Sequence, residues 1–156
     1  MIKLMRLDER FIHGQVAFSW TNNLNADCIF IANDEIANDK LRQTSLKLAA
    51  PAGVKFVAKG MEDAKRILNG EKIKKYKVFV IVNSTADALE LTKTVDELRH
   101  LNLGNMKKTD ERKVITNSLA VSDDDIKNIK EMESLGVEVE CRAVPTDKKI
   151  RALDLL

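Results

Sequence analysis

The 156-residue sequence has little of what marks several large classes of protein. Aromatic residues make up only 4% of it, so a core must be aliphatic. The two cysteines both fall in apolar stretches, where we expect buried, reduced thiols, with a disulfide as the less favoured alternative. No apolar run approaches the roughly 18 residues that a membrane span needs, and residues 1–6 are too short and too charged for a signal peptide. We therefore expect a cytoplasmic protein.

An excess of one charge is also absent. Lys and Arg number 26 against 24 Asp and Glu, a net charge of +2, whereas dedicated nucleic-acid binders usually carry a basic excess. Solvated loops explain the two basic runs, residues 72–77 and 107–113, and Tyr76 alone offers no stacking platform. The GxxxxGK[ST] and GxGxxG loops of nucleotide-binding proteins are missing. We expect no nucleic acid, metal or cofactor.

What the sequence does contain fits one globular domain over residues 1–156. Hydrophobic residues make up 44% and charged residues 32%, a mixture that argues against disorder. A chain of this length can bury roughly two-thirds of the surface that its unfolded form exposes. One core and no second domain are predicted.

Apolar runs alternate with amphipathic stretches along the chain. Strands are predicted at residues 2–5, 28–32, 54–58, 78–82, 113–121 and 137–144, and helices at 15–24, 40–50, 61–68, 86–100 and 123–135. Residues 101–106 are ambiguous, and residues 148–156 form a short helix or an extended segment. The alternation predicts an α/β fold, an open, mostly parallel twisted sheet with helices on both faces in three layers.

Two further side chains have structural interpretations. His100 ends the predicted helix over residues 86–100, where a cation complements the helix dipole. Trp20 falls on the apolar face of the first predicted helix, where packing is its expected role.

The segment Arg6-Leu7-Asp8-Glu9-Arg10-Phe11-Ile12-His13-Gly14-Gln15-Val16 joins the first predicted strand to the first helix. Ligands of open α/β sheets gather beyond the carboxyl ends of the strands, which is where this loop lies. A histidine with an ordinary pKa near 6.5 is mostly neutral at cytoplasmic pH and presents a lone pair. His13 is therefore a candidate nucleophile towards phosphorus.

A phosphoryl group on His13 carries a charge close to minus two, which must be neutralised. Arg6 and Arg10 are predicted to bind its oxygens through paired hydrogen bonds, a geometry that suits guanidinium. Gly14 leaves room for the phosphate, and backbone amides around Gln15 add donors at the start of the helix.

Two roles are open for Asp8: it either fixes Arg10 or hydrogen-bonds the far ring nitrogen of His13 and so selects the tautomer. The alternative interpretation of Arg6, Asp8 and Arg10 is a solvated ion-pair turn. Asn33 and Asp34, after the second strand, are expected to line the same edge of the sheet.

The stretch from residue 6 to 16 resembles the signature loop of IIB subunits of the mannose, fructose and sorbose class of bacterial sugar phosphotransferase systems. Asn33-Asp34, residues 102–106 and residues 142–145 also resemble family features, although Asn105 stands where a second glycine is expected. In that family the histidine at the place of His13 accepts phosphate from the IIA subunit at its δ nitrogen. The sugar takes it while bound to the membrane subunits IIC and IID.

The resemblance implies a phosphocarrier that associates peripherally with those membrane subunits, with the IIA protein and a sugar as further partners. A rival hypothesis is a regulatory module of the same fold that binds a phosphorylated ligand or RNA without turnover. The sugar, whether mannose, fructose, sorbose or an N-acetylated amino sugar, stays open, as does a homo-oligomeric state.

Overall fold

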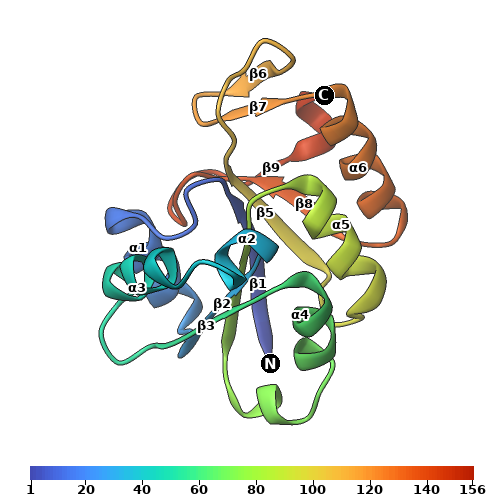
Figure 1. The fold of residues 1–156 in the computed structure, drawn as a ribbon. Coiled ribbons are helices and arrows are strands. Elements are labelled where there is room, and N and C mark those ends of the chain that lie inside the picture. Colours follow the sequence, from blue (N-terminus) through green and yellow to red (C-terminus); the bar gives the residue numbers. More distant parts are fainter.

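A computed structural model describes all 156 residues. The chain forms one central sheet between two layers of helices (Figure 1). The seven strands lie in the order β3-β2-β4-β1-β5-β8-β9, and only β9, at one edge, is antiparallel to its neighbour. The strands are β1 (Ile2–Asp8), β2 (Cys28–Ala32), β3 (Lys55–Lys59), β4 (Val78–Val82), β5 (His100–Asn105), β8 (Glu138–Cys141) and β9 (Ile150–Arg151). The predicted three-layer fold with a mostly parallel sheet is confirmed.

The helices divide between the two faces of the sheet (Figure 1). One face carries α1 (Gly14–Leu24), α2 (Asp34–Ala37) and α3 (Lys40–Ala49), and the other carries α4 (Met61–Leu68), α5 (Thr85–Thr94) and α6 (Asp123–Ser134). Short 3₁₀ helices occupy η1 (Lys72–Lys75) and η2 (Ala152–Leu155). None of these helices combines the length and apolar character required to cross a bilayer.

The two faces are packed unequally. The face under α4, α5 and α6 has a cluster of 28 buried hydrophobic residues, and the face under α1 has only 10. Side chains alternate along β1, so Met5 and Leu7 join the larger cluster while Leu4 joins the smaller one. Arg6 and Asp8 follow Leu4 on the α1 face, and both are buried. The α1 face is therefore partly polar near the carboxyl end of β1.

A separate hairpin stands beyond the carboxyl edge of the sheet, at the top of Figure 1. Its strands are β6 (Lys113–Thr116) and β7 (Leu119–Val121), which pair antiparallel. The weak alternation over residues 113–121 thus belongs to two short strands rather than one.

The predicted helix over residues 86–100 is wrong in its second half. The helix ends at Thr94, and Val95 takes an extended conformation before a turn in which the amide of Leu98 binds the carbonyl of Val95. Both apolar side chains of this turn are buried, so apolar spacing continued past the end of the helix. His100 therefore begins β5 and does not complement a helix dipole.

Candidate active site

The loop after β1 lies at the carboxyl edge of the sheet, between two neighbouring parallel strands. Asp8 ends β1, and it fixes the following turn because its Oδ1 accepts from the Arg10 amide at 2.9 Å and its carbonyl accepts from the Phe11 amide at 2.9 Å. Phe11 and Ile12 then insert into the small cluster under α1, with exposed fractions of 3% and 4%. Phe11 adopts a φ of 60°, an unfavourable value for a bulky residue.

His13 follows as the N-cap residue of α1. The next residue, Gly14, has a φ of 49°, in the left-handed region that glycine enters without a Cβ penalty. The His13 side chain forms no capping hydrogen bond, so the first-turn amides of α1 have no side-chain acceptor.

The His13 ring is held by Asp8. Nε2 lies 3.1 Å from Asp8 Oδ2, and the aspartate is fully buried while the histidine side chain is 18% exposed. Because a carboxylate accepts a hydrogen bond, this contact favours the tautomer protonated at Nε2. Nδ1 is then the nitrogen with a lone pair, and it has no partner within the chain. Of the two contacts left open for Asp8, its side chain makes the one with the histidine ring through Oδ2, and it holds Arg10 only at the backbone amide, through Oδ1.

Arg6 lies inside the protein, not at the surface where a phosphate would bind. Nε and Nη2 donate to Asp8 Oδ2 at 3.3 and 3.1 Å, while Nη1 donates to Asn102 Oδ1 at 2.6 Å and to the Arg142 carbonyl at 3.2 Å. Desolvation lowers the pKa of Arg6 below its ordinary value, and Asp8 opposes that shift. The expected phosphate contact of Arg6 does not fit this arrangement, because the N–H groups of its guanidinium are already directed at protein acceptors.

Arg10 and Gln15, in contrast, are exposed, and their side chains form no hydrogen bond or ion pair within the chain. Arg10 also lines an open groove of about 810 Å³ between the loop and the β6–β7 hairpin. Arg112, a basic residue on the hairpin side of this groove, is already paired with Glu9 at 2.8 Å. Arg10 is therefore the arginine of the segment that is available to an anion.

Asn33 and Asp34 occupy the same edge of the sheet but two strands away, at the end of β2. Asn33 caps α2 by accepting from the Ile36 amide at 2.9 Å, and Asp34 accepts from the Met61 amide at 2.8 Å. Both side chains fix connections, and neither contacts His13.

Four residues around Arg6 escaped the sequence-based site. The guanidinium groups of Arg6 and Arg142 lie 5.3 and 5.0 Å from the centre of the Trp20 indole. Trp20 is fully buried, as its packing role predicted. Asn102 and Glu140 continue the polar contacts of Arg6 towards β8.

Gly104 makes space for this arrangement. A Cβ at this position would lie 2.0 Å from Cζ of Arg6. The segments 102–106 and 142–145, singled out in the sequence as family features, thus include three residues that surround Arg6: Asn102, Gly104 and Arg142. The resemblance of these two segments to family features was the signal by which the residues could have been found, but it did not indicate their role.

Comparison with known proteins agrees with this fold. A family model described as the PTS system sorbose subfamily IIB component matches residues 2–156. A probable phosphotransferase enzyme IIB component of Streptococcus pyogenes serotype M6 is 34% identical over 162 residues, covering 100% of this chain and 99% of the relative. The mannose-specific EIIAB component of Escherichia coli K12 is 32% identical over 156 residues, covering 100% of this chain and 48% of that protein.

A solved structure shows the same fold. The crystal structure of the IIBSor domain of the sorbose permease from Klebsiella pneumoniae matches with a TM-score of 0.94 at 32% identity, covering 99% of this chain and 94% of that one.

The fold and the site thus define a phosphotransferase component. The chain belongs to the sorbose subfamily of IIB components of the phosphotransferase system, and its function lies in sugar phosphotransfer. No comparison supports the rival hypothesis of a regulatory module that binds RNA or a phosphorylated ligand. The two basic runs also lie apart, residues 72–75 in η1 near the amino terminus and residues 107–113 beside the hairpin at the opposite end (Figure 1).

Proposed function

We propose that His13 carries the phosphoryl group on Nδ1, between a phosphorylated IIA component and a sugar. The observation that carries this proposal is the 3.1 Å contact between His13 Nε2 and the buried Asp8. It engages one ring nitrogen and leaves the other free, on a partly exposed side chain at the uncapped start of α1.

The first transfer needs no metal and no separate base. The Nδ1 lone pair attacks the phosphorus of the donor's phosphohistidine, the donor's N–P bond breaks, and its electron pair stays on the donor nitrogen. The imidazole of His13 becomes positively charged, and the carboxylate of Asp8, accepting from Nε2–H, stabilises that charge. In the second transfer a sugar hydroxyl oxygen attacks phosphorus, the Nδ1–P bond breaks and the hydroxyl proton is released.

Charge on the transferred group is neutralised by donors that the chain leaves unused. The first-turn amides of α1 and the exposed guanidinium of Arg10 are such donors. Arg6 contributes indirectly, because it holds Asp8. A small number of donors suits a carrier, since tight binding of the phosphate would oppose its onward transfer.

The phosphodonor in this proposal is a IIA component, which the EIIAB name of the mannose-specific relative supports. The sugar is bound by membrane IIC and IID components, on which this chain docks from the cytoplasm.

The two histidines of the chain make the test simple. Incubation with a phosphorylated IIA component should label the wild type and His100→Gln, but not His13→Gln. The label should be acid-labile and base-stable, and NMR of the phosphorylated ring should place it on Nδ1. Circular dichroism checks that both variants fold. Normal labelling of folded His13→Gln would disprove the assignment.

A further inference from the structure

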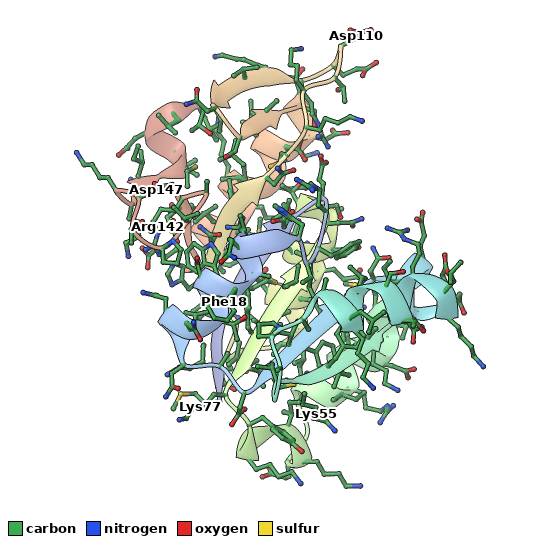
Figure 2. The ribbon with its side chains drawn as sticks, turned by 90° about the vertical axis from the view of Figure 1, so that its left-hand side faces the viewer. Phe18, Lys55, Lys77, Asp110, Arg142 and Asp147 are labelled. Atoms are coloured by element: carbon green, nitrogen blue, oxygen red, sulfur yellow. The ribbon has the colours of Figure 1, made fainter.

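A continuous series of polar contacts leaves the His13 site and crosses the sheet from β1 through β5 to β8. From Asp8 it passes to Arg6, then through Asn102 of β5 to Glu140 of β8. Arg6, Asp8, Asn102 and Glu140 are each at most 2% exposed. β1, β5 and β8 are neighbours in the sheet, and we call the four residues the polar strip. Figure 2 views the α1 side of the molecule, with Phe18 of α1 and Arg142, which follows β8, labelled.

Asn102 has only one orientation that satisfies its neighbours. Its Oδ1 accepts from Arg6 at 2.6 Å, while its Nδ2 donates to both carboxylate oxygens of Glu140, at 3.3 and 3.2 Å. An inverted amide would direct its NH₂ at the Arg6 guanidinium and its oxygen at the carboxylate. Nδ2 also donates to the Arg142 carbonyl at 3.1 Å, so Glu140 and that carbonyl together fix which end of Asn102 faces Arg6.

Glu140 can do this only as a carboxylate. Besides Asn102, it accepts from Nη2 and Nε of Arg142 at 2.8 and 3.1 Å, and its Oε1 lies 3.1 Å from His100 Nε2. Burial raises the pKa of Glu140, but the hydrogen bonds from His100 and Arg142 outweigh burial and bring the net pKa below its ordinary value. A glutamine amide would face an Arg142 N–H whichever way it turned.

Asn102 in turn restrains Arg6, and Arg6 restrains Asp8. Arg6 directs two N–H groups at Asp8 Oδ2, the same oxygen that contacts His13 Nε2. If Asn102 lost its orientation, Arg6 would lose its 2.6 Å contact and with it part of its hold on that oxygen. The position of Oδ2 decides whether the ring proton stays on Nε2.

We infer that Glu140 is a positioning residue for phosphoryl transfer, which keeps Nδ1 of His13 unprotonated through Asn102, Arg6 and Asp8. This inference rests on the proposed role of His13. It adds that a side chain two strands away, with no contact to the histidine, determines how much of the ring is in the reactive tautomer.

The test compares Glu140→Gln with Glu138→Gln. Glu138 lies on the same strand and face, but its contacts are with Lys149 and, at 3.9 Å, His100 Nδ1. We expect ¹⁵N NMR of Glu140→Gln to show a raised fraction of His13 protonated at Nδ1. Phosphorylation by the IIA component should slow about 10- to 100-fold, as misplacement of a reacting group does. Glu138→Gln should match the wild type in both measurements.

Arg142→Lys provides a second test should Glu140→Gln fail to fold. It keeps the positive charge but removes the two-point contact with Glu140, so the tautomer should shift in the same direction by a smaller amount. A folded Glu140→Gln or Arg142→Lys with the wild-type tautomer and rate would overturn the inference while His13 remained the labelled residue. Labelling of His13→Gln would instead contradict the proposed role of His13 as the phosphocarrier.

Discussion

At the scale of the residue, the site depends on a buried arginine that needs a glycine beside it. Arg6 was expected at the phosphate because the strand was predicted to end at residue 5. The strand instead continues to Asp8, so alternation turns both charged side chains inwards under α1. Charged residues interrupt the apolar pattern from which strands are predicted. The residues of the loop were therefore identified from the sequence, but the burial of Arg6 was not.

Gly104→Ala should disturb the site through Arg6. The new Cβ would lie 2.0 Å from Cζ of Arg6, so the guanidinium must move. We expect a loss of about 1–3 kcal/mol in the free energy of unfolding, typical of overpacking, together with slower phosphorylation of His13. Gly53→Ala is the control: its φ of 81° strains an alanine, but its Cβ would meet nothing within 4 Å. Urea unfolding measures the stability of both variants, and labelling rates measure phosphorylation of His13. Unchanged labelling in Gly104→Ala would contradict this role of the glycine.

Arg10→Lys should slow phosphoryl transfer without lowering stability. The Arg10 side chain is exposed and bonds to nothing in the chain, so folding does not depend on it. Lysine keeps the charge but loses the paired hydrogen bonds to phosphate oxygens, and a loss of about 1.4 kcal/mol in the transition state corresponds to a tenfold slower rate. Stopped-flow labelling and thermal unfolding measure the two effects. A wild-type rate in Arg10→Lys would show that the guanidinium does not bind the transferred group.

At the scale of the element, strands and helices with long apolar patterns were predicted well, whereas short or polar elements were not. The strands at residues 28–32 and 78–82 and the helix at 61–68 have the predicted bounds. The four-residue α2 was missed, because its one buried apolar side chain, Ile36, gives no periodicity. β5 remained ambiguous because Asn102 and Gly104 occupy its α1 face, where they adjoin the Arg6 side chain and interrupt the apolar pattern.

The capping box of α6 gives a prediction at this scale. The Ser122 side chain accepts from the Asp125 amide at 3.1 Å, and Asp125 Oδ2 accepts from the Ser122 amide at 2.9 Å. Ser122→Ala should lower the free energy of unfolding by about 1 kcal/mol.

Ser134→Ala is the matched control in the same helix, since its exposed hydroxyl bonds only to the carbonyl of Glu131. Chemical denaturation measures the free energy of unfolding of both variants. Equal values for Ser122→Ala and Ser134→Ala would show that the cap contributes nothing to stability.

At the scale of the whole molecule, the two faces of the sheet differ in what they bury. The α4–α6 side buries the cluster of 28 hydrophobic residues, while the α1 side combines its 10 with the polar strip from Asp8 to Glu140. Alternation of strands and helices predicts the layers but not the strand order. The adjacency of β1, β5 and β8, which brings Arg6, Asn102 and Glu140 together, was therefore beyond reach from one sequence.

Two buried thiols should make the stability of the whole molecule fall in alkaline solution. Burial raises the pKa of Cys28 to about 11 and that of Cys141 to about 12, from an ordinary value of 9.0. Above pH 9 the unfolded thiols lose protons that the folded ones keep, so unfolding releases protons and is favoured as pH rises. Each thiol should contribute up to about 1.4 kcal/mol per pH unit between pH 9 and its folded pKa.

Urea unfolding under reducing conditions at pH 8, 9, 10 and 10.5 measures this slope. The wild type is compared with Cys28→Ala and Cys141→Ala, which separates the contribution of each thiol from that of the other groups in the chain. Each alanine variant loses packing at every pH but removes one titrating group, and its decline with pH should be shallower than that of the wild type. Parallel curves for all three proteins would mean that the thiols ionise equally in the folded and unfolded chains, contrary to their burial in the folded protein.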